Sequence, residues 1–245
     1  MGRALRVEAL KLWLTPALLA GVTGTLCAGA GLTGLQAGIV NAEPGSAAGP
    51  EVLDAVRVGQ LGALGLGLML GGGEYRHGTL DSLLCAFPRR GTAFLAKVTV
   101  LIAAASLLAM AATVLGMGLG AVVLHGRGLR VGVPLGQLAG GVARMVAAYG
   151  LLAILGLGVA ILLRGPAVAL AAIIVGWILC NGLASQLDPA LARLLPSSAD
   201  ERLTALHTFQ EDQPLPPAVA GLVLAGYVAV LLGLAAWRFA RRDVD

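Results

Sequence analysis

Charged and aromatic residues are scarce in this chain. Of its 245 residues, 12% are charged and 4% are aromatic, whereas 58% are hydrophobic. A soluble domain carries about a quarter charged residues, because it must cover its surface with groups that water solvates. Most of the surface of this chain must therefore face something other than water, and lipid is the simplest candidate.

Clustered basic residues and paired cysteines are also lacking. The net charge is +4, but the basic residues lie between apolar runs and form no stripe or patch, which excludes nucleic acid as a partner. Cys27, Cys85 and Cys180 lie far apart and form no CxxC pair. The sequence therefore predicts neither a disulfide framework nor a metal site.

The apolar runs contain almost no groups for chemistry. They hold no Asp, Glu or His, which disfavours ion-driven transporters, and His77, His125 and His207 all lie in predicted loops, which disfavours intramembrane haem. Ser106 has no base within the runs, and no glycine-rich segment ends in the GK[ST] of a phosphate-binding loop. Arg144 is expected to extend toward the outer headgroups, with a substrate contact as the alternative. We predict no catalytic residue and no cofactor site in this chain.

Six apolar runs are long enough to cross a bilayer, which takes about 20 residues of helix. We therefore predict an all-α integral membrane protein, with residues 1–245 forming one transmembrane domain. The predicted spans are 14–40, 55–73, 98–124, 137–163, 166–186 and 218–236.

The basic residues divide unequally between the two sides of these spans. The two termini and the even-numbered loops hold 11 of the 17 basic residues, and the opposite side holds eight of the 13 acidic ones. Because positive charge is retained inside the cell, both termini are predicted to be cytoplasmic, in a multi-pass protein of the plasma membrane.

Two short helices are predicted outside the spans. Residues 1–13 place Leu5, Ala9, Leu12 and Trp13 on one face, typical of a helix lying in the headgroup interface; the alternative is a charged flank of the first span. A capping box at 198–201 predicts a second short helix over 199–209, between spans five and six.

Two GxxxG pairs predict close helix contacts, within one chain or between two. They are Gly67 with Gly71, and Gly116 with Gly120. The run 71–73 is entirely glycine and is expected to loosen the end of the second span.

The segment after the second span combines an apolar stripe with basic residues. Leu80, Leu83, Leu84 and Phe87 recur with helical spacing, so 79–87 is predicted to be a short amphipathic helix. Thr79 can cap its start and Pro88 ends it, and the basic residues 89, 90 and 97 are expected at anionic headgroups. The stripe needs a covering surface, which on this pattern alone is the bilayer, the protein's own helices or a docked partner.

The same segment resembles a family motif, E-[YF]-R-x-G-T-L-x-x-L-L-x-x-P, followed by basic residues and an alanine-lysine pair that opens the third span. With six spans and an interfacial first helix, the chain resembles the type-2 permeases of ATP-binding-cassette (ABC) exporters. The matching residues are Glu74, Tyr75, Arg76, Gly78, Thr79, Leu80, Leu83, Leu84, Pro88, Arg89, Ala96 and Lys97.

The resemblance implies that 79–87, including Phe87, is a coupling helix that docks into a separate ABC ATPase subunit. Glu74, Arg76 and Thr79 would lie at the base of the second span, and ATP and Mg would be bound by the ATPase. A second permease chain would complete a homodimer or heterodimer.

Few polar residues are available along the spans, which favours export of a hydrophobic or amphipathic cargo such as a peptide antibiotic, drug or lipid. The alternatives are a membrane adaptor that recruits a soluble protein and a membrane-embedded lipid-modifying enzyme.

Overall fold

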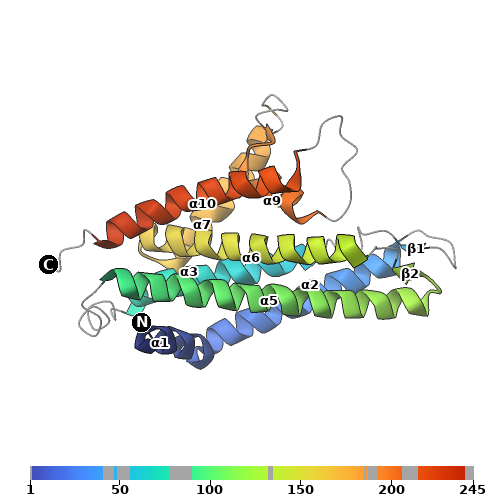
Figure 1. Ribbon diagram of the computed structural model, residues 1–245, viewed down its shortest axis with the longest axis horizontal. Helices are drawn as coiled ribbons and strands as arrows, with labels where there is room; N and C mark the ends of the chain where they lie inside the picture. The colour runs from blue at the N-terminus through green and yellow to red at the C-terminus, as the bar shows by residue number, and fades with distance from the viewer. Residues whose placement is uncertain are drawn as a thin grey trace.

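The protein is a bundle of helices that run mostly along one axis (Figure 1). The structure, a computed structural model, describes residues 2–40, 47–48, 56–77, 90–131, 135–184, 186, 192–205 and 215–240. Its helices are α1 Gly2–Leu14, α2 Pro16–Ile39, α3 Gln60–His77, α5 Arg90–Gly126, α6 Leu135–Leu163, α7 Pro166–Ala184, α9 Pro196–Thr204 and α10 Pro217–Ala240. A 3₁₀ turn over 56–59 precedes α3, and β1 Ala47–Ala48 pairs in parallel with β2 Arg130–Val131.

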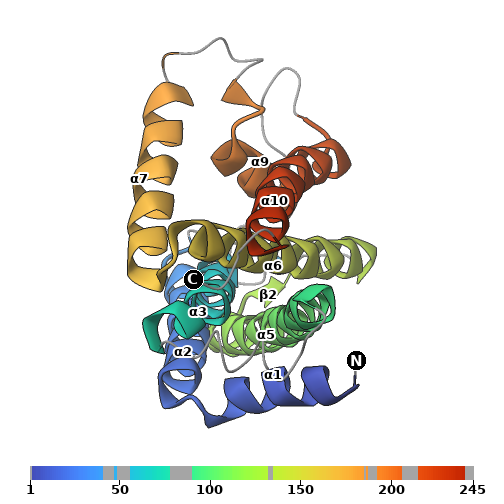
Figure 2. The ribbon, with the colours of Figure 1, turned by 90° about the vertical axis from the view of Figure 1, so that its left-hand side faces the viewer.

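Helices α1 and α7 depart from the common direction (Figure 2). Figure 2 looks along the bundle and shows α3, α5 and α10 nearly end-on, whereas α1 lies across one side and α7 stands across the other. The turn from α6 into α7 is tight, and Arg164 within it has a positive φ of 58°.

Five of the described helices, α2, α5, α6, α7 and α10, are long and apolar enough to cross a membrane, judged by length and composition. This finding confirms the prediction of a helical, multi-pass membrane protein at that level. The predicted span 55–73 falls in α3, which is not among the five. Its glycines contribute little hydropathy, and its last turn carries Glu74, Arg76 and His77.

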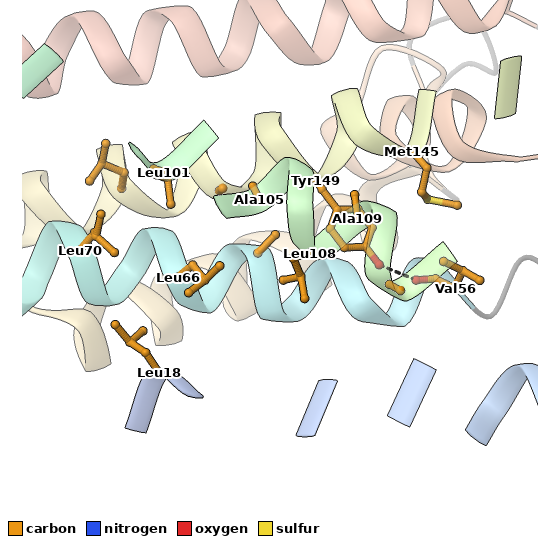
Figure 3. Packing of buried hydrophobic residues seen from close by; sticks show 14 of the residues in the cluster. Leu18, Val56, Leu66, Leu70, Leu101, Ala105, Leu108, Ala109, Met145 and Tyr149 are labelled. Atoms are coloured by element: carbon orange, nitrogen blue, oxygen red, sulfur yellow. Dashed lines mark hydrogen bonds between the residues drawn. The ribbon is translucent and has the colours of Figure 1, made fainter. Parts of the chain in front are cut away.

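Instead of facing lipid, α3 forms the centre of the bundle. Over residues 60–73 its side chains are buried or half-buried except along one stripe, where Leu61 and Met69 are exposed. Leu66 and Leu70 of α3 pack in the main apolar core with residues of α5 and α6, among them Leu101 and Tyr149 (Figure 3). The Tyr149 hydroxyl donates a 2.7 Å hydrogen bond to the carbonyl oxygen of Val56, which fixes the start of α3 to α6.

Glycines bring the backbone of α3 against that of α6. A Cβ atom on Gly67 would overlap the carbonyl oxygen of Ala153, and one on Gly71 would lie 2.7 Å from that of Leu157. From the other side, a Cβ on Gly156 would lie 2.6 Å from the carbonyl oxygen of Leu64. The first GxxxG pair therefore lies at a contact within the chain.

The glycine run 71–73 does not loosen the helix, contrary to the sequence-based expectation. α3 continues through it to His77. A Cβ on Gly72 would lie 2.6 Å from the backbone nitrogen of Pro166, so the glycines admit α6 and the start of α7 at close range. Close packing on both sides supplies the stability that the glycines lack as helix formers.

Gly116, the first glycine of the second GxxxG pair, faces α2 and the 3₁₀ turn. A Cβ on Gly116 would lie 2.6 Å from Val56 Cγ2 and 3.3 Å from Thr33 Oγ1, and Gly120 is buried one turn further along α5.

The predicted bounds of two helices were wrong. The short helix α9 begins at Pro196 rather than at residue 199, with Leu195 as its N-cap residue and no side-chain cap bond, and it ends at Thr204. Proline at the first helical position has its φ preset for a helix, which makes the capping box at Ser198 unnecessary.

α5 begins at Arg90, well before the predicted residue 98, because the charge of Lys97 is compensated inside the bundle, as described below.

Replacement of Gly67 by alanine tests the α3–α6 contact. We expect Gly67→Ala to destabilise the protein by about 1–3 kcal/mol, because the new methyl group must displace the Ala153 carbonyl. Gly65→Ala is the matched control, since a Cβ there meets nothing within 4 Å and alanine favours helix by up to about 1 kcal/mol. Thermal melts of both variants in detergent should rank Gly67→Ala below wild type and Gly65→Ala at or above it. Equal melting of the two variants would contradict the backbone contact.

Candidate functional site

The motif segment connects the end of α3 to the start of α5. Glu74 and Arg76 lie in the last turn of α3, which ends at His77, and α5 begins at Arg90. These helix ends lie at the same end of the bundle as α1 (Figure 1). The predicted coupling residues between them fall outside the described residues, namely Gly78, Thr79, Leu80, Leu83, Leu84, Phe87, Pro88 and Arg89.

Lys97, the last residue of the motif, is buried at this end of the bundle. Its side chain is 4% exposed, and its Nζ donates a 3.0 Å hydrogen bond to the carbonyl oxygen of Leu70 in α3. The same Nζ lies 3.5 Å from Oε2 of Glu8 in α1, whose side chain is also 4% exposed. One ammonium group thus joins α1, α3 and α5, and we call this set of contacts the Lys97 junction.

The expectation that Lys97 faces lipid headgroups was therefore wrong. A buried ammonium group is tolerated only with a counter-charge and further hydrogen bonds, and Glu8 and the Leu70 carbonyl supply both. Lys97 also lies within the apolar stretch Phe94–Gly126, so α5 carries an ionisable residue that the predicted span excluded.

Glu8 is shared between two lysines. Its Oε1 accepts from Lys11 Nζ at 3.0 Å, one helical turn along α1, and its Oε2 faces Lys97. The Lys11 side chain is 40% exposed, so this pair lies at the edge of the protein and contributes less than the buried one. Each oxygen of the Glu8 carboxylate therefore has a cationic partner.

The apolar faces of α1 are used differently from the prediction. Leu12, on the face expected to enter the headgroup interface, packs against the main core. Among the α1 side chains that the structure describes, the large apolar ones that are exposed are Val7, Leu10 and Leu14, which recur with helical spacing on another face. The inward-facing carboxylate decides this orientation, because Glu8 must reach Lys97.

The composition of the sequence points to a pairing of Glu8 with Lys97, although a search for motifs does not use it. Glu8 is the one acidic residue of the first 40, and Lys97 is one of the two lysines of the chain. A lone lysine at the start of an apolar helix requires a counter-charge, but the partner lies 89 positions away in sequence. Local spacing could not identify it.

The charged groups of the Lys97 junction are used in contacts between helices. The described residues contain no group of three or more His, Cys, Asp or Glu side chains that could hold a metal ion. Glu8 is occupied by two ammonium groups, and Lys97 by Glu8 and a backbone carbonyl. Such an arrangement holds helices in register.

No family model matches the chain, and no curated protein matches it.

Removal of either member of the buried pair should destabilise the protein. Glu8→Gln removes the carboxylate that contacts the buried ammonium group of Lys97, and Lys97→Met leaves the buried Glu8 carboxylate paired with the half-exposed Lys11, so we expect each to lose more than about 2 kcal/mol. The double variant Glu8→Met/Lys97→Met should recover most of that loss, because it leaves neither charge behind. Thermal melts followed by size-exclusion chromatography in detergent measure the ranking.

Lys11→Met is the control, with an expected loss within about 1 kcal/mol because its side chain is 40% exposed. Additive losses in the double variant would contradict a direct interaction between Glu8 and Lys97.

Proposed function

We propose that the chain is the transmembrane permease subunit of an ATP-driven ABC exporter, with ATP hydrolysis in a separate partner chain. The observation that carries the proposal is the motif over 74–97, because it begins in the last turn of α3 and ends at the Lys97 junction. The two described residues that close the motif, Ala96 and Lys97, are both buried. A motif anchored in this way is suited to pass a displacement into the bundle.

A displacement of the coupling segment can reach the helices of the bundle through the Lys97 junction. α3 and α5 flank the coupling segment, and Lys97 links both helices to α1. The backbone contact of α3 with α6 extends the connection, because packed glycine faces shift as one body. A push on 78–89 by a docked ATPase would therefore act on four helices together.

In this proposal α3 is the second of six spans. Its burial by neighbouring helices relieves it of the hydropathy that a lipid-facing helix needs, which supports a crossing despite its glycines. The asymmetry of the basic residues supports two cytoplasmic termini and a plasma-membrane location. The coupling segment then faces the cytoplasm, where ATP is available.

The exposed side chains fit surroundings of lipid and a second permease chain. α7 exposes large apolar residues along its length, among them Val168, Ile174 and Ile178, which suit contact with acyl chains or a partner helix. A homodimer or heterodimer of permeases with two ATPases, exporting a hydrophobic or amphipathic cargo, is consistent with the few polar groups on these helices.

Leu84→Asp tests the coupling helix. If Leu84 anchors a partner, an aspartate forces a charge into a desolvated groove and should weaken ATPase binding at least about tenfold. Ser82→Asp is the matched control, since it adds the same charge on the opposite face of the predicted helix. The measurement is a pull-down of the ABC ATPase partner that the proposal requires, from membranes with equal levels of each variant.

Undiminished ATPase binding and transport by Leu84→Asp would make 79–87 an ordinary loop. Binding of a soluble protein without any effect on ATP turnover or transport would favour the membrane adaptor.

A further inference from the structure

The short helix α9 is seated on α6 and α10, beside the start of α10 and away from α1 (Figure 1). Ala199 and Leu203 of α9 are buried against Ala148 of α6 and Leu224 of α10. The fit is close, because a Cβ on Gly221 of α10 would lie 3.2 Å from Leu203 Cδ1. A helix of nine residues is unstable by itself, so this seat holds α9 in place.

The buried face of α9 also carries two polar side chains. Asp200 is 3% exposed and Ser197 is 6% exposed, and their spacing places them on one face of the helix. Within the described part of the chain, Asp200 Oδ1 and Ser197 Oγ are buried without a hydrogen-bond partner. A carboxylate without compensating hydrogen bonds is costly to bury, and a neutral carboxylic acid is much less so.

Among the described residues, several charged side chains lie on α9 and on the elements near it. Arg57, in the 3₁₀ turn before α3, lies 3.7 Å from Glu201 and acts on Asp200 as well. α9 itself carries Glu201 and Arg202, Arg193 lies shortly before it, and α6 carries Arg144; of the described charges, Arg57 and Glu201 are the ones that act on the Asp200 carboxyl. Helix α7 has no charged residue, and the one charge of α10, Arg238, lies in its last turn, at the opposite end from the seat.

Burial dominates the balance at Asp200. It raises the pKa of the carboxyl to about 6, against a lowering by the positive charge of Arg57 and a further raising by Glu201. The proton is therefore exchanged in a range of pH that cells and their surroundings reach.

We propose that α9 is a pH-sensitive clasp, whose seat on α6 and α10 loosens when Asp200 loses its proton. In the seated state the carboxyl holds its proton more tightly than in an unseated, solvated state, where its pKa is near the ordinary value of about 4. The stability that Asp200 gives the seat is full below that ordinary value. It is lost as pH rises through about 6.

The clasp has two consequences for the bundle. Release of α9 uncovers Ala148 of α6 and Leu224 of α10, and it removes Glu201 from Arg57 at the start of α3. Acidic conditions keep this end of the bundle closed, and neutral conditions favour its opening. The clasp is a property of this chain alone and does not depend on the proposed transport.

Hydrogen–deuterium exchange of the whole chain in detergent tests the clasp. The opening of α9 is read from the protection factors of its amides, which correct for the intrinsic effect of pH on exchange. Opening should be about tenfold more frequent at pH 7.5 than at pH 5.0, from a shift between an ordinary carboxyl and a seated one near 6.

Asp200→Asn should remove the pH dependence and keep α9 at least as protected as wild type at pH 5.0, because a neutral amide resembles the protonated carboxyl. Glu201→Gln is the matched control on the same helix, and it should retain the pH dependence because the Glu201 side chain is 55% exposed. Equal protection of wild-type α9 at both pH values would overturn the proposal. An unchanged pH dependence in Asp200→Asn would also overturn it.

Discussion

The contact between α3 and α6 is the constraint on which the rest of the bundle depends. Glycines at positions 67, 71 and 156 let the two backbones meet, and no larger residue fits there without a shift. This contact places a helix of modest hydropathy at the centre, where protein rather than lipid covers it. Both ends of α3 are then in reach of neighbours: Tyr149 bonds Val56 at the start, and Lys97 bonds Leu70 near the end.

Buried ionic groups described in the structure lie near both ends of this central helix. Those at one end are paired with opposite charges, whereas one at the other end is not. At the α1 end, Glu8 lies between Lys11 and Lys97, so each charge in the network has an opposite charge beside it. At the α9 end, Arg57 reaches Glu201, but the Asp200 carboxylate is left with a buried oxygen that has no partner among the described residues. The first end is fixed by its charges, whereas the second can change with the protonation of one group.

The sequence predicted the helices well where an apolar run is long, since about 20 such residues suffice to mark a crossing. It did not predict which faces meet. The orientation of α1 depends on Glu8 and Lys97, which are far apart in sequence, and the role of the glycine run 71–73 depends on Pro166. The start of α9 depended on a proline that the capping-box pattern at Ser198 concealed. Local patterns set helix positions, but pairings across the chain set the junctions.

The most direct test of the account uses the two lysines of the chain, Lys11 and Lys97. An amine-specific acylating reagent is added to membranes that contain the folded protein, and mass spectrometry follows the modification of each lysine with time. The account predicts fast modification of Lys11, whose side chain is 40% exposed, and very slow modification of Lys97, whose side chain is 4% exposed, with equal rates after denaturation. Equal rates in the folded protein would place Lys97 at the surface and contradict the junction of α1, α3 and α5.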